Sequence, residues 1–333
     1  MTVISAQHNQ NAQQGAKQGT QQGADTQQNQ HPTAFIPRTI GVVGLGLIGG
    51  SFAKAFAAAA QNSHNPSHST QLYIYERNPN TRALALDELG CGTLTPDTIP
   101  FCELIILALY PHANQEWLVR NAQYISPDAL VIDTAGVKRA TCDYCFSLAK
   151  NYAWHFIGCH PMAGTQYSGF AHARANMFNK APMVVCCADN TTKPQADTHT
   201  LAARLRALLE PCGFASYCNA TPQFHDQQIA YTSQLAHVVS NAYVKSPAAQ
   251  MHKGFSAGSY KDLTRVARLN PVMWCELFMD NRDNLSHEID LLIHELARYK
   301  QALDDGDAET LTQLLEQGDA LKRQAERKAE HSS

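Results

Sequence analysis

The sequence predicts an α/β domain built on a parallel sheet, followed by an all-α domain. Two observations carry this prediction. From residue 39 to about residue 187, short apolar runs alternate with helical segments, a pattern typical of strands whose two faces are both covered by helices. After Thr221, helical periodicity continues and almost no strand pattern remains.

Each expected strand is a short run of β-branched or large aliphatic residues. The runs are Thr39–Val43, Leu72–Tyr75, Glu103–Leu109, Ala129–Asp133 and Met183–Cys187, with Phe156–Gly158 as a further strand. Helices are expected at Gly50–Ala60, at Arg82–Leu89 (ended by Gly90) and at Trp117–Tyr124. In the second domain, the helical pattern covers Asp226–Val244 and continues from Val272 to about Arg327.

A chain of 333 residues has room for two domains. Residues 1–37 are rich in Gln, Asn, Ala, Gly and Thr, and we expect this segment to be disordered because it can bury little apolar surface. The predicted domains are therefore 38–221 and 222–328. One apolar stripe in the second domain predicts a homodimer interface, formed by Ile289, Leu292, Leu296, Tyr299 and Leu303.

Composition argues against several classes of partner. A net charge of −3 gives no indication of a nucleic-acid partner, and no apolar run reaches the roughly 20 residues of a membrane span. No secretory signal pattern is present at the N-terminus, and the ten cysteines are expected to be thiols in a reducing, cytoplasmic compartment. No metal site is expected, because neither the Cys142/Cys145 pair nor the His64/His68 pair is joined by further ligands at metal-site spacing.

A glycine-rich turn follows the first strand and opens a helix. It reads Gly44-Leu45-Gly46-Leu47-Ile48-Gly49, the G-x-G-x-x-G pattern in the strand–turn–helix setting that gives the pattern its meaning. Gly44 makes the tight turn, Gly46 leaves room for a pyrophosphate, and Gly49 allows close packing of helix on strand. The first domain is therefore predicted to be a Rossmann-type dinucleotide-binding domain.

Glu76 ends the second strand, where a carboxylate can accept hydrogen bonds from both hydroxyls of a ribose. It lies 32 residues after Gly44, and the polar loop at 61–70 accounts for the extra length. A carboxylate there favours NAD, while Arg77, the next residue, could pair with a 2′-phosphate and leaves NADP open. Asp133 ends a further strand, so it is expected to line the nicotinamide side of the cofactor.

His160 is the candidate general base. Pro161 restricts it to an extended conformation, and Gly164 and Gly169 allow the backbone to turn close to a ligand. The ordinary pKa of histidine, near 6.5, suits proton abstraction at neutral pH. From these residues alone, a buried histidine at a strand end is an equally good interpretation.

Several spaced motifs together make the chain resemble the prephenate/arogenate dehydrogenase family of tyrosine biosynthesis, over about residues 39–300. The motifs are the glycine turn, Asp133–Lys138, Gly158–Gly169, Ser233-Gln-Leu-Ala-His237, Lys261-Asp-Leu-Thr-Arg265, Pro271 and Trp274. The resemblance implies an oxidoreductase that transfers hydride from prephenate or arogenate to a nicotinamide cofactor with loss of CO2. It also implies a helical dimerisation domain.

The resemblance assigns roles to four residues. His160 accepts the proton of the C4 hydroxyl, Arg265 holds a substrate carboxylate, and Ser233 and His237 contact the substrate side chain. Lys261 is a weaker candidate for the role of Arg265. The His225-Asp226 pair is typical of the family, but we assign it no chemistry and interpret Asp226 as a helix N-terminal residue.

Gly136 and Gln166 stand where many family members carry serine and glutamate, and Gln234 and Ala236 replace a frequent histidine and proline. The sequence leaves open the choice between prephenate and arogenate, and feedback by tyrosine. Two other functions remain as alternatives. One is a β-hydroxyacid dehydrogenase, which would need a lysine within the helix at 226–244, where Lys245 lies only at the end. The other is a non-catalytic NAD-binding regulator.

Overall fold

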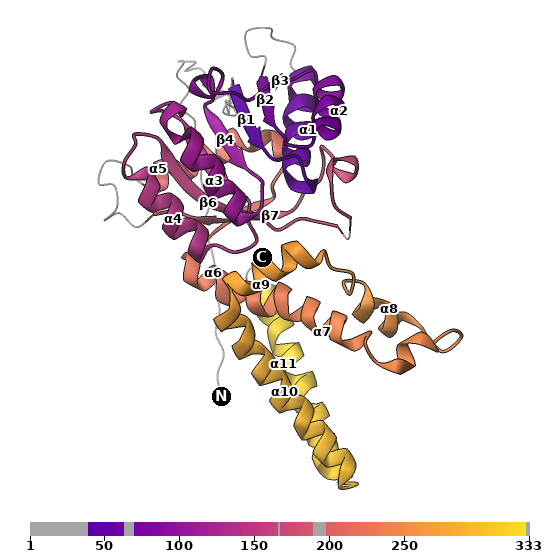
Figure 1. Ribbon diagram of the computed structural model, residues 1–333. Coiled ribbons are helices and arrows are strands. Elements are labelled where there is room, and N and C mark those ends of the chain that lie inside the picture. The colour runs from indigo at the N-terminus through magenta and orange to yellow at the C-terminus, as the bar shows by residue number, and fades with distance from the viewer. Residues whose placement is uncertain (1–38, 63–69, 166, 189–197, 331–333) are drawn as a thin grey trace, which may run out of the picture. The chain divides into compact units, whose positions relative to one another are not determined.

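The computed structural model describes residues 39–62, 70–165, 167–188 and 198–330 (Figure 1). The Gln-rich segment at 1–37, the His64/His68 pair and Gln166, for which the sequence made predictions, lie outside these ranges. Within these ranges, no helix is both long and apolar enough to cross a bilayer.

An eight-stranded sheet forms the first part of the chain, with strand order β3-β2-β1-β4-β5-β6-β7-β8 (Figure 1). The strands are β1 (Thr39–Val43), β2 (Gln71–Tyr75), β3 (Gly92–Thr93), β4 (Leu104–Leu107), β5 (Leu130–Asp133), β6 (His155–Pro161), β7 (Pro182–Cys186) and β8 (Ser216–Asn219). From β1, the chain adds β2 and β3 on one side and β4 and the later strands on the other, so the strand order reverses between β1 and β4. In open α/β sheets, ligands bind at such a switch point, beyond the carboxyl ends of the strands.

The prediction of a parallel sheet is correct for β1 to β6 and wrong for β7. This strand pairs antiparallel with β6, with His160 opposite Val184 and Cys159 opposite Val185, and β8 pairs parallel with β7. Antiparallel neighbours can be joined without a crossover helix. In the described part of the connection from β6 to β7, the one helical element is a short 3₁₀ turn, Phe170–His172. The strands β3 and β8 were not predicted.

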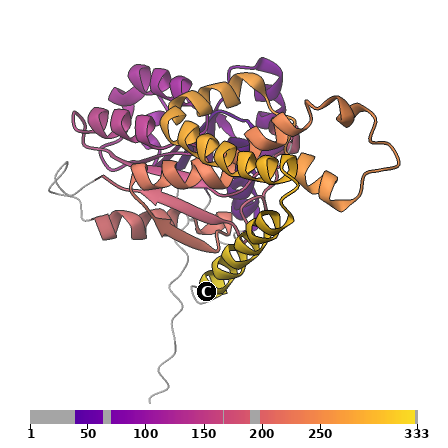
Figure 2. The same ribbon diagram turned by 90° about the horizontal axis from the view of Figure 1, so that it is seen from below.

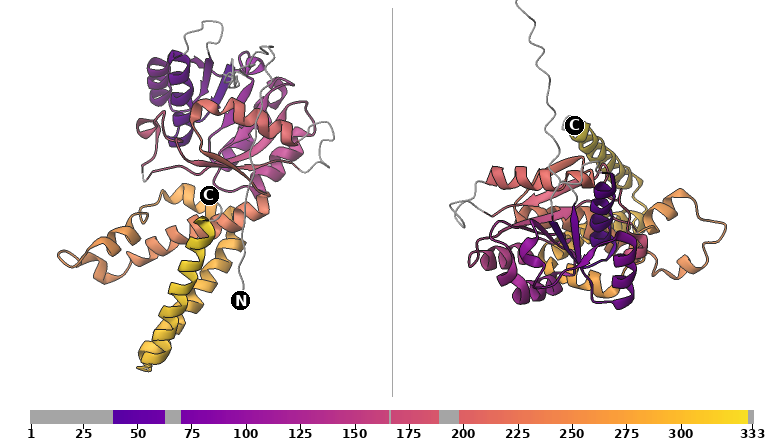
Figure 3. Two further views of the ribbon diagram at one scale, coloured as in Figure 1. Left: turned by 180° about the vertical axis from the view of Figure 1, so that it is seen from behind. Right: turned by 90° about the horizontal axis from the view of Figure 1, so that it is seen from above.

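Helices cover both faces of the sheet (Figures 1 and 3). The first apolar core contains residues of α1 (Leu47–Asn62), α2 (Pro79–Leu89) and α5 (Thr198–Leu208). The second contains residues of α3 (Pro111–Asn121) and α4 (Arg139–Ala149). Strands such as β4 and β5 are buried along their whole length, which explains their unbroken apolar sequences.

Local signals mark several helix ends, but the predicted starts were too late: α1 begins at Leu47 rather than Gly50, and α2 at Pro79 rather than Arg82. The helices α4 and α5 were not predicted. Asn78 caps α2 by accepting from the N–H groups of Asn80 and Thr81, and Gly90 ends it in the left-handed conformation. Similarly, α3 begins at Pro111, six residues before the predicted start at Trp117, because proline is favoured in the first turn of a helix.

In the second part of the chain, from residue 222 on, the described residues form helices joined by turns and loops, with no strand among them. Its helices are α6 (Pro222–Ile229), a π-helical segment (Ala230–Leu235), α7 (Ala236–Tyr243), α8 (Gly258–Thr264), α9 (Pro271–Asp280), α10 (Arg282–Asp304) and α11 (Ala308–Glu330). The continuous helical run expected from Val272 is thus three helices. It is interrupted at Asn281 and again at Gly306, whose positive φ of 67° ends a helix without strain.

The helices α10 and α11 pack side by side as a hairpin (Figures 1 and 3). Leu296 and Leu303 of the predicted stripe are 57% and 64% exposed, so the hairpin leaves part of that stripe uncovered. The segment between α7 and α8 extends outward (Figures 1 and 2), and Phe255 within it is 93% exposed.

Candidate active site

The glycine turn between β1 and α1 is built as the sequence predicts. Gly44 has a φ of +92°, and a Cβ there would lie 2.9 Å from the carbonyl oxygen of Ala108. A Cβ on Gly49 would lie 1.9 Å from the carbonyl oxygen of Gly44, so both positions require glycine for packing. A Cβ on Gly46 would meet no protein atom within 4 Å. Packing alone does not demand glycine at 46, whereas close approach of a pyrophosphate would, so the turn fits a dinucleotide.

The remaining residues of the turn pack their side chains inward. Leu45 is buried, and Leu47 and Ile48 pack against the first apolar core. Their side chains therefore stabilise the turn, while the N-terminus of α1 offers N–H groups and a partial positive charge to phosphate oxygens.

Glu76 lies beside the glycine turn, as expected for a residue that binds a ribose. Its Oε2 accepts a 2.9 Å hydrogen bond from the N–H of Leu45, and its Oε1 accepts one of 2.8 Å from the N–H of Asn78. These two bonds hold the carboxylate at the end of β2. Each oxygen keeps further lone-pair capacity for a ligand hydroxyl.

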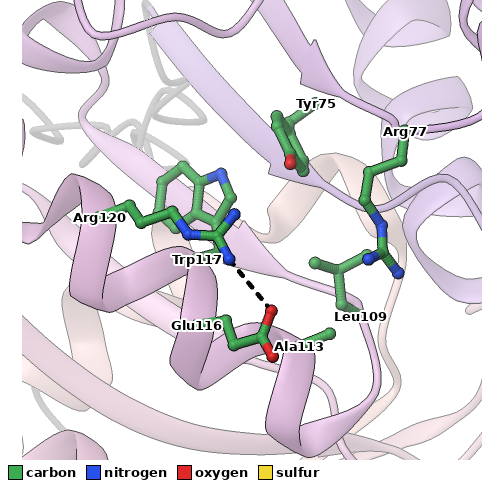
Figure 4. Close-up of a pocket in the computed structure, with 7 residues that line it drawn as sticks. All are labelled: Tyr75, Arg77, Leu109, Ala113, Glu116, Trp117 and Arg120. Carbon is green, nitrogen blue, oxygen red and sulfur yellow. Dashed lines mark hydrogen bonds and ion pairs between the residues drawn. The ribbon is translucent and has the colours of Figure 1, made fainter.

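A small pocket lies next to Glu76, at the ends of β2 and β4 (Figure 4). It is lined by Tyr75, Arg77, Leu109, Ala113, Glu116, Trp117 and Arg120. Arg120 pairs with Glu116 at 3.3 Å, whereas Arg77 extends toward Leu109 from the opposite wall. The predicted cofactor residue Arg77 thus belongs to a pocket with both an aromatic wall and guanidinium groups.

Asp133 is placed differently from the expectation. It has no exposed surface, and its Oδ2 is paired with the ammonium of Lys138, which is also completely buried. Oδ2 also accepts from the N–H of Ala135, and Oδ1 accepts from the N–H of Cys159 at 3.0 Å. This burial argues against direct contact between the Asp133 carboxylate and a cofactor. Asp133 instead links the end of β5 to β6 through Cys159, the residue that precedes His160.

His160 is the next-to-last residue of β6 and is partly buried. Its Nδ1 lies 2.9 Å from Nε2 of His225, and Nδ1 of His225 lies 2.7 Å from Oδ1 of Asp226. Burial, His225 and Lys138 hold the pKa of His160 well below its ordinary value, because each of them disfavours an imidazolium. At neutral pH, His160 is therefore the neutral imidazole that a general base must be.

Asp226 is a buried junction between elements. Burial opposes ionisation, but hydrogen bonds from His225 and from the N–H groups of Arg139 and Lys138 outweigh it, so the pKa of Asp226 is lowered. The interpretation of Asp226 as the N-terminal residue of its own helix is wrong. Thr221 caps α6, and Asp226 caps α4.

Ser233 and His237 do not join His160 directly. His237 lies twelve residues after His225 along almost continuous helix, which corresponds to about 18 Å. Its Nδ1–H donates a 2.8 Å hydrogen bond to the carbonyl oxygen of Ser233, and its ring packs 4.0 Å from that of Trp274. Ser233 lies in the π-helical segment, whereas the helical pattern at 226–244 predicted a regular α-helix.

Arg265 is exposed and follows α8. Burial and the nearby guanidinium of Arg265 lower the pKa of His237, although the bond to Ser233 opposes this shift. A neutral imidazole and a guanidinium therefore lie near one another at the far end of the α6–α7 helix from His160. Such an arrangement is suited to binding a carboxylate.

The structure has room for a larger side chain at Gly136. A Cβ there would meet only the side chain of Leu277, at 3.6 Å, an ordinary contact. Packing therefore admits a serine at this position.

No role was assigned to His225 from the sequence, although the His225-Asp226 pair was recognised near the start of a helix. No local pattern indicates that His225 meets His160, because 65 residues separate them. Arg139 and Asn281, which also contact Asp226, were missed for the same reason.

The doubly wound sheet, its glycine turn and a neutral imidazole at the same sheet edge define a nucleotide-binding oxidoreductase. Comparison with known families agrees. A prephenate dehydrogenase nucleotide-binding domain model matches residues 57–213, and a prephenate dehydrogenase dimerisation domain model matches residues 221–317.

Individual relatives lead to the same family. Prephenate dehydrogenase of Bacillus subtilis is 27% identical, over 82% of this chain and 72% of its own length. Cyclohexadienyl dehydrogenase of Zymomonas mobilis is 28% identical, over 80% of this chain and 90% of its own. The crystal structure of Synechocystis arogenate dehydrogenase is 26% identical and covers 86% of this chain and 99% of its own, with a TM-score of 0.68. The chain belongs to the prephenate/arogenate dehydrogenase family.

Proposed function

We propose that the protein is an NAD-dependent prephenate dehydrogenase that converts prephenate to 4-hydroxyphenylpyruvate and CO2. The observation that carries the proposal is the neutral imidazole of His160 at the carboxyl end of β6. The parallel strands β1, β4, β5 and β6 end at the same edge of the sheet. Three strand spacings, about 14 Å in all, separate the end of β1 from the end of β6. An extended dinucleotide on the glycine turn can bridge that distance.

The chemistry requires one base and one cation. A bound nicotinamide ring would accept the hydride from C4 of prephenate. His160 takes the proton of the C4 hydroxyl as the C4 carbonyl forms, and loss of the C1 carboxylate as CO2 makes the ring aromatic. A positioned base of this kind contributes about 10²–10⁴-fold to the rate.

Arg265 is proposed to hold a substrate carboxylate, with His237 and Ser233 near the substrate side chain. Guanidinium can form two parallel hydrogen bonds with a carboxylate, which an ammonium cannot. The lowered pKa of His237 supports the role proposed for Arg265. It keeps the imidazole neutral, so that Arg265 supplies the positive charge beside His237.

NAD is proposed over NADP because Glu76 lies beside the glycine turn, hydrogen-bonded to Leu45, where a carboxylate could accept from the ribose hydroxyls. A carboxylate there repels a 2′-phosphate. A crystal structure of Aquifex aeolicus prephenate dehydrogenase with hydroxyphenyl propionate and NAD+ is 24% identical, covers 86% of this chain and 98% of its own, and has a TM-score of 0.72, so it supports the fold that holds such a cofactor. Arg77, in the neighbouring pocket, is the observation that favours NADP as the second candidate.

Arogenate is the second candidate substrate. It differs from prephenate only in an amino group in place of the side-chain keto group, and the relatives named above include enzymes with both substrate names. Prephenate is proposed first because the family resemblance associates it with the members that use NAD.

A two-by-two assay tests the proposal, with each substrate combined with each cofactor and absorbance of the reduced cofactor as the signal. We expect the highest kcat/KM for prephenate with NAD. Equal or faster turnover of arogenate would overturn the substrate assignment. Binding of NAD without turnover of either substrate would indicate a non-catalytic regulator.

We also propose that 38–221 and 222–328 are the two domains and that the protein is a homodimer. The exposed apolar side chains on the α10–α11 hairpin support a partner surface; they are Leu291, Ile293, Leu296, Leu303, Leu315 and Leu321. Light scattering on a size-exclusion column would test this proposal. A monomer at micromolar concentration would contradict it.

A further inference from the structure

Three side chains form a hydrogen-bonded series that ends at the proposed base. His160 comes from β6, while His225 and Asp226 come from the first two turns of α6. We propose that His225 and Asp226 are positioning residues that hold His160 in the tautomer with an unprotonated Nε2. The inference rests on the proposed function for its catalytic meaning, but the tautomer itself can be measured without turnover.

The direction of each hydrogen bond follows from Asp226. An ionised carboxylate only accepts hydrogen bonds, so Nδ1 of His225 must carry the proton that lies 2.7 Å from Oδ1 of Asp226. Neutral imidazole has one donor and one acceptor, which makes Nε2 of His225 the acceptor. The atom facing it, Nδ1 of His160, must then carry a proton. Nε2 of His160 is left with its lone pair, as the base requires.

Asp226 is firmly fixed in this role. Its Oδ1 also accepts from the N–H of Lys138 at 2.7 Å, and its Oδ2 accepts from the N–H of Arg139 at 2.9 Å. Its backbone carbonyl accepts a 2.8 Å hydrogen bond from the side-chain amide of Asn281. With neither freedom to rotate nor exposed surface, the carboxylate determines the orientation of the His225 ring.

The ring arrangement adds a second constraint. The rings of His160 and His225 meet edge to face, with centroids 5.1 Å apart and planes inclined by 63°. His225 is almost completely buried, so no solvent competes for its nitrogen atoms. Nε2 of His225 is therefore available as the acceptor for Nδ1–H of His160 while both rings are neutral.

Two substitutions of His225 test the proposal. His225→Leu removes the acceptor for Nδ1–H of His160, and we expect kcat to fall by about ten- to a hundredfold with KM nearly unchanged. His225→Gln places an amide oxygen where Nε2 was, so it should restore much of kcat. His199→Leu, at an exposed position of α5 away from the site, is the matched control and should behave as wild type. Wild-type kcat in His225→Leu would overturn the proposal.

Nitrogen NMR of protein labelled with ¹⁵N-histidine gives a readout that needs no substrate. The wild-type His160 ring, assigned by its absence in His160→Asn, should show a protonated Nδ1 and an unprotonated Nε2 at pH 7.5. In His225→Leu the two tautomers should be mixed. A wild-type ring protonated at Nε2 would overturn the proposal even if prephenate is oxidised. The expected tautomer without turnover of either substrate would instead contradict the proposed function alone.

Discussion

Arg139 and Asp226 join the first turn of α4 to α6 through one carboxylate oxygen. Oδ2 of Asp226 accepts from the backbone N–H of Arg139 at 2.9 Å and from its Nε at 3.3 Å. The guanidinium of Arg139 also pairs with Asp283 of α10. A helix of the α/β domain is thus tied to two helices of the helical domain at the point where His225 meets His160.

Asp226→Asn should destabilise the protein. An amide cannot accept all the hydrogen bonds that Asp226 receives from α4 and His225, so we expect a loss of about 1–3 kcal/mol in unfolding free energy. Urea denaturation measures it. Asp283→Asn is the control, because an exposed ion pair contributes only about 0–1 kcal/mol. An equal effect of the two substitutions would contradict the assignment of Asp226 as the junction.

His160→Asn should lower kcat by about 10²–10⁴-fold with a modest change in KM, since it removes the base and leaves the substrate contacts. Steady-state kinetics with prephenate and NAD measures both constants. Cofactor affinity, followed by fluorescence titration, should be unchanged. Near-normal turnover would remove the role of His160.

The acidic limb of the pH profile should lie below pH 6.5. His160 acts as a base only when neutral, and burial with His225 and Lys138 lowers its pKa well below the ordinary value. As pH falls, kcat/KM should therefore remain high through pH 6.5 and decline only when the pH passes the lowered pKa. A profile of kcat/KM from pH 5 to 8 measures this limb. A midpoint at or above 6.5 would show that His160 is not shielded as the structure indicates.

Arg265→Ala should raise KM for prephenate far more than it lowers kcat, because it removes binding that is similar in the ground state and the transition state. Arg265→Lys should recover only part of the affinity, since an ammonium cannot form paired hydrogen bonds with a carboxylate. Arg268→Ala, at an exposed arginine three residues away, serves as the control. Similar KM values for the two alanine variants would exclude Arg265 as the anchor.

Glu76→Ala should weaken NAD binding by about tenfold and reduce the preference for NAD over NADP. The substitution removes an acceptor for the ribose hydroxyls, together with the negative charge that repels a 2′-phosphate. It also frees the N–H of Leu45, so part of the effect comes from the glycine turn. The ratio of kcat/KM for the two cofactors measures the preference. An unchanged ratio would place cofactor selection elsewhere, with Arg77 as the next residue to vary.

The sequence alone determined the features that depend on neighbours in the chain. The glycine turn is such a feature, because Gly44 and Gly49 lie five residues apart and their requirement for glycine arises within one strand–turn–helix unit. The helix caps at Asn78 and Thr221 are equally local. Likewise, the buried strands β4 and β5 follow from short apolar runs, and the change to an all-helical pattern after Thr221 follows from periodicity.

Tertiary structure decided what depends on residues far apart in the chain. The direction of β7 could not be predicted, because a buried apolar strand has the same sequence pattern beside a parallel or an antiparallel neighbour. Only the fold brings His225 to His160 across 65 residues and sets Asp226 at the start of α4, 88 residues from Lys138. Hydrogen bonds between distant groups leave no periodic trace in a sequence, and in this protein they determine the surroundings of His160.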